Sequence, residues 1–223
     1  MPSMSRTPLL AIAAALTAVL AAPTAASADV VEIGKAAEPG ASSCPDNCFA
    51  VSRTTGYQAK IGTTRGPMVV PKDGYLVAWT IALGKPGEKQ TEFFERRLGG
   101  ESEALITVLD PQRKLNSRVV AQGTTRKLER FFGTTVQFPL PRALRVKKGQ
   151  VVALTVPTWA PALAVGLGGD TSWRASRARG QCDDSGVQTA QAERNQSTQY
   201  YCLYRTARLA YSATLVTSPY AKD

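Results

Sequence analysis

The chain has 223 residues, of which 43% are hydrophobic and 20% are charged, and this balance excludes both a disordered and a collagen-like polypeptide. It carries 27 Lys and Arg against 17 Asp and Glu and contains no His. The usual general base and the commonest metal ligand are therefore missing, which excludes hydrolases of the serine and cysteine kinds that depend on a catalytic histidine.

The N-terminus predicts a secretory signal peptide over residues 1–28. Arg6 provides a basic start, residues 9–22 form an apolar run, and Ala26-Ser27-Ala28 is a small-residue cleavage site. The apolar run is shorter than the roughly 20 residues that a membrane-spanning helix needs. We therefore expect a secreted, extracellular protein that begins at Asp29 and has no membrane span after cleavage.

The charge of the expected mature chain is strongly positive. Removal of Arg6 leaves 26 Lys and Arg against 17 Asp and Glu, a net charge of +9 that is spread over the chain. Summed positive charge attracts polyanions without regard to their sequence. We expect an anionic polysaccharide or cell-wall polymer as partner and no specific nucleic acid, with plain solubility as the alternative explanation of the charge.

Four cysteines, an even number in an exported chain, predict disulfides. We favour the pairs Cys44–Cys48 and Cys182–Cys202 because the members of each pair lie close in sequence. Zinc is the rival interpretation, but the spacing fits no common zinc pattern and histidine is absent. Three residues separate the first two cysteines, where redox motifs have two. We expect no metal and no cofactor.

Residues 29–47 are interrupted by Gly, Pro and Ser and are predicted to form a flexible leader, followed by a single domain over residues 48–223. In that domain short apolar runs alternate with Gly and Pro, which is typical of antiparallel sandwiches. The expected fold class is all-β, an antiparallel two-sheet sandwich with two disulfides and little helix, with jelly-roll topology as the finer expectation.

The clearest strand covers residues 75–83, in which Val77, Trp79, Ile81 and Leu83 share one face. Further strands are predicted, in chain order, over residues 104–109, 118–122, 136–140, 144–156 and 203–216. The stretch 144–156 has the pattern of two strands around a Lys-Gly turn, as in a hairpin. The window 89–97 has some helical character but fits a strand or a loop equally well.

Two kinds of catalytic chemistry remain open without histidine. Carboxylate pairs can hydrolyse glycosides, and the close pairs are Glu92 with Glu95, Glu101 with Glu103, and Asp183 with Asp184. Lyases of acidic sugars use Tyr and Arg, and the candidates are Tyr200, Tyr201, Tyr204 and Arg205. The Arg-Thr-Glu and Tyr-Lys-x-Gly-x-Tyr strings of alginate-type lyases are absent, and solvated loop charges explain the carboxylates equally well.

Aromatic side chains offer a binding alternative, because flat ring faces stack on sugars without a catalytic partner. Trp79 belongs to the core by its alternation, whereas two other tryptophans are predicted at the sandwich rim among prolines and polar residues. The predicted ligand-binding patch consists of Trp159, Trp173, Arg174, Arg177 and Arg179. In the structural alternative both indoles cover the sandwich ends and the arginines pair with Asp170, Asp183 and Asp184.

A family resemblance rests on four strings taken together. They are Gly74-Tyr75-Leu76-Val77-Ala78-Trp79, Val146-Lys147-Lys148-Gly149-Gln150-Val151-Val152-Ala153-Leu154, Pro157-Thr158-Trp159-Ala160-Pro161 and Tyr201-Cys202-Leu203-Tyr204. As a group they resemble an uncharacterised family of exported β-sandwich proteins from high-GC Gram-positive bacteria, over about Cys44 to Val216. The Val-Lys-Lys-Gly-Gln turn between strands is also similar to jelly-roll carbohydrate-binding modules. The resemblance implies a fold and brings no activity.

These patterns predict a secreted, non-catalytic protein that binds an anionic glycan or cell-envelope polymer through a basic, Trp-containing surface. The alternatives are a secreted polysaccharide hydrolase or lyase, and a structural or protein-partner module. A catalytic carboxylate or Tyr should lie in a groove with Arg or Lys, whereas a binding site needs only exposed aromatic and cationic groups.

Overall fold

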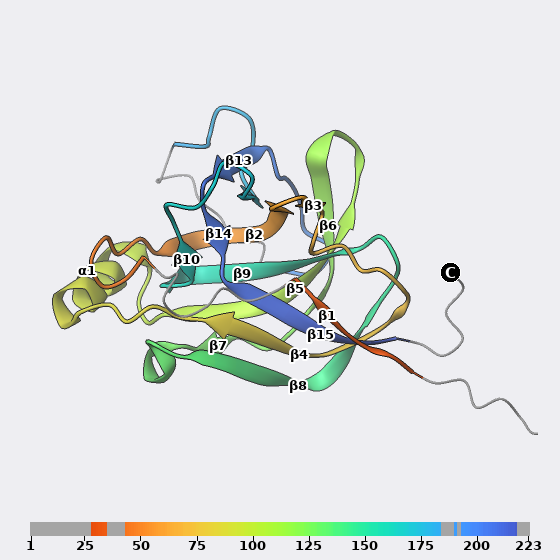
Figure 1. Cartoon of the computed structure of the whole chain (residues 1–223), viewed down its shortest axis with the longest axis horizontal. Coiled ribbons are helices and arrows are strands. Elements are labelled where there is room, and N and C mark those ends of the chain that lie inside the picture. Colours follow the sequence, from red (N-terminus) through yellow and green to blue (C-terminus); the bar gives the residue numbers. More distant parts are fainter. Residues whose placement is uncertain (1–27, 35–42, 184–189, 191–192, 218–223) are drawn as a thin grey trace, which may run out of the picture.

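A computed structural model of the chain describes residues 28–34, 43–183, 190 and 193–217 (Figure 1). The expected signal peptide lies outside the described residues, apart from Ala28. The described part is all-β with antiparallel strand pairs, one α-helix and two disulfides, which confirms the predicted fold class. The two larger of its three sheets fit a sandwich, and the jelly-roll topology stays a prediction.

The smaller sheet has the strand order β1-β15-β4-β8. These strands are β1 (Val30–Ile33), β15 (Tyr211–Thr217), β4 (Gly74–Ala82) and β8 (Thr135–Val146). They form the lower layer in Figure 1. Trp79, Ile81 and the following Leu83 are fully buried, as their alternation predicts. The register shift between Leu76 and Ala78 buries Leu76 in the core and leaves Val77, predicted on the same face as Trp79, half-buried.

The larger sheet has the order β12-β6-β5-β9-β2-β11-β13. In that order the strands are β12 (Ser197–Gln199), β6 (Asn116–Gln122), β5 (Glu103–Pro111), β9 (Val151–Ala160), β2 (Val51–Ile61), β11 (Ser172–Ala175) and β13 (Cys202–Arg205). The short strands β3 (Thr64–Arg65) and β7 (Arg126–Lys127) pair with β2 and β5, and β10 (Leu163–Ala164) pairs with β14 (Arg208–Leu209). Two 3-10 turns, η2 (Arg113–Leu115) and η3 (Glu129–Phe131), complete the elements along with α1.

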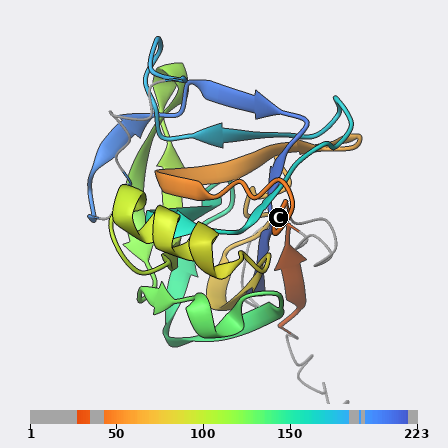
Figure 2. The same ribbon diagram turned by 90° about the vertical axis from the view of Figure 1, so that its left-hand side faces the viewer.

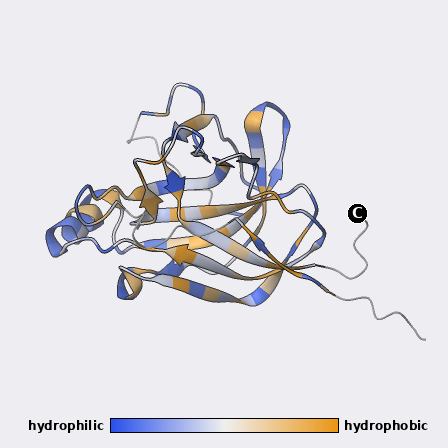
Figure 3. Cartoon of the chain, in the orientation of Figure 1, coloured by the Kyte–Doolittle hydropathy of each residue, from blue (hydrophilic) through white to orange (hydrophobic). Residues whose placement is uncertain are grey.

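The central strand β9 is buried on both faces. Every residue from Val151 to Val156 is buried, and β9 pairs with β2 on one side and β5 on the other. A continuous apolar run is what such a strand requires, because neither face meets water. Figure 3 shows hydrophobic residues along the strands, whereas the helix α1 (Glu88–Leu98) is mainly hydrophilic.

The larger sheet curls until its two edge strands meet. β12 and β13 are at opposite ends of the strand order, yet only Tyr200 and Tyr201 separate them in sequence. Inside the curl a chain of hydroxyls joins Thr55 to Thr155 at 2.8 Å and Thr155 to Thr107 at 2.7 Å. The polar groups on this buried face therefore satisfy one another.

The predicted hairpin over residues 144–156 is wrong. β8 pairs with β4 in the smaller sheet, whereas β9 pairs with β2 and β5 in the larger one, so the turn at Lys147–Gln150 crosses between sheets. The prediction for residues 136–140 also ended too early, because β8 continues through Pro139 and Pro141. Proline is tolerated there since β8 is an edge strand.

Three further expectations need correction. Residues 30–33 of the expected flexible leader form β1, which pairs with β15 and buries Ile33. The ambiguous window 89–97 is helical, in α1 (Glu88–Leu98), which crosses one end of the larger sheet (Figure 2). The stretch 203–216 divides into β13, β14 and β15, with Thr206 at a φ of 55° between the first two.

Helix α1 has the end signals that short polar helices need. The backbone N–H of Gly87 donates to Gln90 Oε1 at 2.7 Å, and Gly99 ends the helix with a φ of 106°. Arg96 and Arg97 lie in the last turn, where positive charge favours the helix dipole. These local signals favour a helix although none of its residues is fully buried.

The close approach of β15 to the start of β4 yields a stability prediction. A Cβ on Gly74 would lie 2.3 Å from the backbone oxygen of Val216, which no side-chain rotation can relieve. Gly74→Ala should therefore lower the free energy of unfolding by about 1–3 kcal/mol, measured by urea denaturation. Gly169→Ala, where no atom lies within 4 Å, is the control and should change little. Equal stability of the two variants would contradict this packing.

Candidate functional site

A basic hollow lies beside the Cys182–Cys202 disulfide, and we call it the disulfide pocket. Its volume is about 440 Å³, and it is lined by Leu115, Arg174, Cys182, Tyr201, Leu203 and Arg205. Both predicted disulfides form, the other being Cys44–Cys48. The Cys182–Cys202 bridge ties the chain after β11 to the start of β13, so it holds the two arginine-bearing strands of the pocket together.

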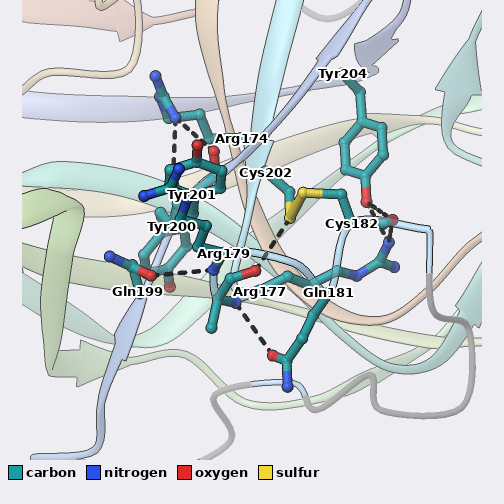
Figure 4. The surroundings of a disulfide bond; sticks show 11 residues. Arg174, Arg177, Arg179, Gln181, Cys182, Gln199, Tyr200, Tyr201, Cys202 and Tyr204 are labelled. Carbon is teal, nitrogen blue, oxygen red and sulfur yellow. Dashed lines mark hydrogen bonds between the residues drawn. A yellow bond between two sulfur atoms is a disulfide. The ribbon is translucent and has the colours of Figure 1, made fainter.

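Arg174 is fixed by the link between the two edge strands. Its Nη1 donates to the backbone oxygens of Tyr200 at 3.1 Å and Tyr201 at 2.9 Å (Figure 4). These carbonyls orient the guanidinium but do not neutralise its charge. Its Nε and Nη2 hydrogens make no hydrogen bond within the described residues, so they can meet an acidic ligand.

Tyr201 and Arg179 form the rim of the pocket. Tyr201 is 39% exposed, and the guanidinium carbon of Arg179 lies 5.9 Å from the centre of its ring. The backbone N–H of Arg179 donates to Gln199 Oε1 at 3.2 Å. The exposed Tyr201 ring lies close to Arg174, Arg179 and Arg205. A ring face beside three positive charges suits a sugar that carries negative charge.

Arg177, also in the predicted patch, has a structural role behind the disulfide. Its Nη1 donates to the Tyr204 hydroxyl and to the backbone oxygen of Cys182 at 3.2 Å, and the same hydroxyl donates to that oxygen at 2.6 Å (Figure 4). Burial raises the pKa of Tyr204, and the Arg177 charge opposes that shift. Arg177 therefore braces the disulfide loop.

The backbone that presents Leu115 to the pocket is strained. Lys114 and Leu115 have φ values of 57° and 62°, a region that residues with a Cβ rarely adopt. The link between β12 and β13, residues 199–202, is called the seam of the larger sheet. Contacts from the seam hold this turn: Gln199 Nε2 donates to Lys114 O at 3.1 Å, and Tyr200 N donates to Leu115 O at 2.8 Å. Strain of this kind concentrates at binding sites, and no sequence signal indicated it.

The expected exposure of Trp159 is wrong. Its side chain is 0% exposed, and its ring packs against Phe94 and Phe132 at 5.0 and 5.5 Å while Nε1 donates to Gly100 O at 2.9 Å. Helix α1, which the sequence did not predict firmly, supplies Phe94 as part of the cover. Trp159 is a core residue under α1, so its replacement would test folding and not binding.

Trp173 also lies apart from the pocket. It is 5% exposed and stacks on Tyr204 at 4.7 Å on one face of β11, whereas the next residue, Arg174, projects from the opposite face. Its register partner on β2 is Gln58, about 20 Å along that strand from Ser52, the partner of Trp159. The predicted patch is therefore not one surface: of its residues only Arg174 lines the pocket, and Arg179 lies beside the Tyr201 ring at its edge.

The alternative ion pairs do not form within the described residues. Neither Asp170 nor Asp183 pairs there with Arg174, Arg177 or Arg179, and Asp184 lies outside the described residues. Among the described residues, ion pairs join Arg118 to Asp110 at 3.4 Å and Lys127 to Glu101. Asp183 lies close enough to Tyr204 for its negative charge to raise the pKa of that phenol, in addition to the larger effect of burial.

The predicted carboxylate pairs have other charged neighbours or lie partly outside the described residues. Glu101 pairs with Lys127, and Glu95 lies near Glu129 as well as Glu92. Asp184 of the third pair is outside the part of the chain that the structure describes. Partial burial and the Glu129 contact raise the pKa of Glu95.

Two of the three candidate tyrosines are unsuited to proton abstraction. Burial raises the pKa of Tyr200 well above its usual value and also raises that of Tyr204, which favours the neutral phenol over the basic phenolate. Tyr201 is exposed and Arg205 lines the pocket, but both fit binding as well as chemistry. Within the described residues, no three His, Cys, Asp or Glu side chains gather to hold a metal.

The Tyr204 hydroxyl allows a test of the disulfide loop. Tyr204→Phe removes the hydroxyl that accepts from Arg177 and donates to the Cys182 oxygen, and it leaves only the longer Arg177–Cys182 hydrogen bond of 3.2 Å. The free energy of unfolding should therefore fall by about 1–2 kcal/mol. Thermal and urea unfolding would measure this loss. Tyr75→Phe, at a 46% exposed ring, is the control. A Tyr204 variant as stable as this control would contradict the bracing role.

The raised pKa of Glu95 predicts a pH dependence of stability. A raised pKa means that the folded state binds the proton more tightly, so this contribution to stability is present at acidic pH and is lost as pH rises from 4.5 through the raised value. Glu95→Gln keeps a donor for Glu129 without titrating. The variant should match or exceed the original stability at neutral pH and show a flatter pH profile.

Urea unfolding across acidic to neutral pH would measure the two profiles. Glu193→Gln makes the same charge change at an exposed site away from this cluster and serves as the control. A profile for Glu95→Gln that parallels the unaltered protein would contradict a raised pKa of Glu95 in the folded state.

Among the described residues, no helix is both long enough and apolar enough to cross a membrane. Comparison with known proteins adds no relative: no family model, no curated protein and no solved structure matches this chain.

Proposed function

We propose that the protein is exported and binds an anionic glycan or cell-envelope polymer in the disulfide pocket, without acting on it as an enzyme. One observation carries this proposal. Arg174, Arg179 and Arg205 surround an exposed tyrosine, and none of them forms an ion pair within the described residues. Positive charge without an internal counterion favours an anionic ligand.

The geometry of the pocket supports a sugar acid more than a simple ion. A guanidinium that is already oriented by two carbonyls loses little further freedom when it binds a carboxylate or phosphate through two parallel hydrogen bonds. The Tyr201 ring and the Leu115 side chain, 39% and 41% exposed, provide the apolar surface on which a sugar ring can pack. Charge and stacking thus act on the same ligand unit.

Export is supported by the chemistry of the cysteines. Two disulfides persist in oxidising compartments outside the cytosol, and the N-terminal residues have the pattern of a signal peptide. Membership of the uncharacterised exported family that the sequence resembles remains part of this proposal.

The disulfide pocket predicts salt-dependent retention on acidic polysaccharide. The double variant Arg174→Gln/Arg205→Gln should weaken binding about tenfold, because each exposed charge pair is worth up to about 1 kcal/mol. Retention on insoluble acidic and neutral polysaccharides at low and high salt would measure this effect. Tyr201→Ala should remove the part of retention that survives high salt, since stacking is not screened.

The matched control removes two charges from α1, as Lys89→Gln/Arg97→Gln. Retention that falls equally in both double variants would mean a diffuse attraction to the net charge and would contradict a defined pocket. Absence of retention on every polysaccharide would discard glycan binding and favour a protein partner at the same surface.

A further inference from the structure

A second basic hollow lies between β6 and β8, and we call it the arginine groove. It has a volume of about 360 Å³, and Arg142, Arg145 and Arg194 contribute to its walls together with Val120 and Leu144. The arginines come from two distant parts of the chain. Arg194 reaches the groove because its Nε donates to Val120 O at 3.0 Å, beside the β12–β6 pairing.

The three guanidinium groups lack a counterion among the described residues. None of them forms an ion pair within the described residues, and no acidic side chain lines the groove. Glu193 is exposed and is the neighbour of Arg194 in sequence, but it does not belong to the walls. Three like charges around one hollow repel one another, and an anion bound between them would relieve that repulsion.

The arginine groove and the disulfide pocket lie at opposite ends of one strand pair. Leu115 of the pocket directly precedes β6, and Val120 of the groove is near the other end of β6, about 17 Å away at the usual rise per residue. Along β12 the order is the same, since Arg194 precedes the strand and Tyr201 follows it. The β6–β12 pair therefore connects the two basic hollows.

The surface between the hollows suits a polysaccharide. Ser197 of β12 is exposed, so a hydroxyl group is accessible beside the path. The nearby charge of Arg118 on β6 is balanced by Asp110 at 3.4 Å. A ligand along this path meets strong positive charge at each end and neutral hydrogen-bonding groups in the middle.

We propose that the ligand is an extended anionic polysaccharide that occupies the disulfide pocket and the arginine groove at the same time, lying along β12. The proposal rests on the proposed function and adds a length requirement to it. Once one end of the chain is bound, the other end is held near the second hollow at a high effective concentration. Affinity should then rise steeply when the ligand is long enough to span the two hollows.

The test compares a short oligogalacturonide, too short to span about 17 Å, with long polygalacturonate. Isothermal titration calorimetry on the purified protein should show two short fragments bound weakly per molecule and the polymer bound far more tightly. The variant Arg142→Gln/Arg145→Gln should bind one short fragment and should bind the polymer about tenfold or more weakly. Both arginines are exposed, so circular dichroism should show an unchanged fold.

The control Lys89→Gln/Arg97→Gln has lost the same charge at α1 and should bind both ligands as the unaltered protein does. Equal polymer affinity in the groove variant and the control would overturn the two-site proposal while leaving the disulfide pocket intact. Absence of binding by either ligand to the unaltered protein would instead overturn the proposed function itself. Equally tight, site-dependent binding of single-stranded DNA of similar charge would overturn the assignment to polysaccharide.

Discussion

The burial of β9 on both faces, from Val151 to Val156, is the constraint on which the rest of the structure depends. A strand that exposes neither face needs a cover on both sides, and the two covers differ in chemistry. On one face the smaller sheet packs an apolar layer that includes Leu76, Trp79 and Leu215. On the other face the larger sheet folds over itself and encloses the hydroxyls of Thr55, Thr107 and Thr155. Buried polar groups destabilise a core unless they form hydrogen bonds, and these three hydroxyls bond to one another.

The seam of that curl explains where the candidate site lies. Two consecutive tyrosines join the edge strands: Tyr200 is 0% exposed and contacts Tyr57 at 5.3 Å, whereas Tyr201 points to solvent. The Tyr200 ring completes the buried face of the larger sheet, and the Tyr201 ring is accessible to a ligand. The Cys182–Cys202 disulfide and the carbonyl contacts of Arg174 fasten the same seam. Closure of the core and presentation of charge thus depend on the same few residues, so the pocket is held without a separate scaffold.

Local patterns in the sequence predicted much of the fold and little of the site. The alternation around Trp79 and the short cysteine spacings each concern contacts within a few tens of residues, and both predictions agree with the structure. The ligand patch failed because Trp173 and Arg174 are neighbours in sequence but project from opposite faces of β11. Leu115 joins the pocket only through long-range pairing of β12 with β6. No period or spacing in a single sequence reports such a pairing, and none reports that α1 covers Trp159.

The pairing of β1 with β15 has a mechanical consequence. In their register Val30 is opposite Val216, so the start of the first strand and the end of the last lie at the same end of the sheet. A force that pulls these two ends apart would load the hydrogen bonds of this antiparallel pair one after another, as in a zipper. A force between β1 and the seam at Tyr201 would instead act across several strands at once. The force needed to unfold the protein should therefore be low when Val30 and Val216 are pulled apart, and higher when force is applied between β1 and a ligand bound at Tyr201.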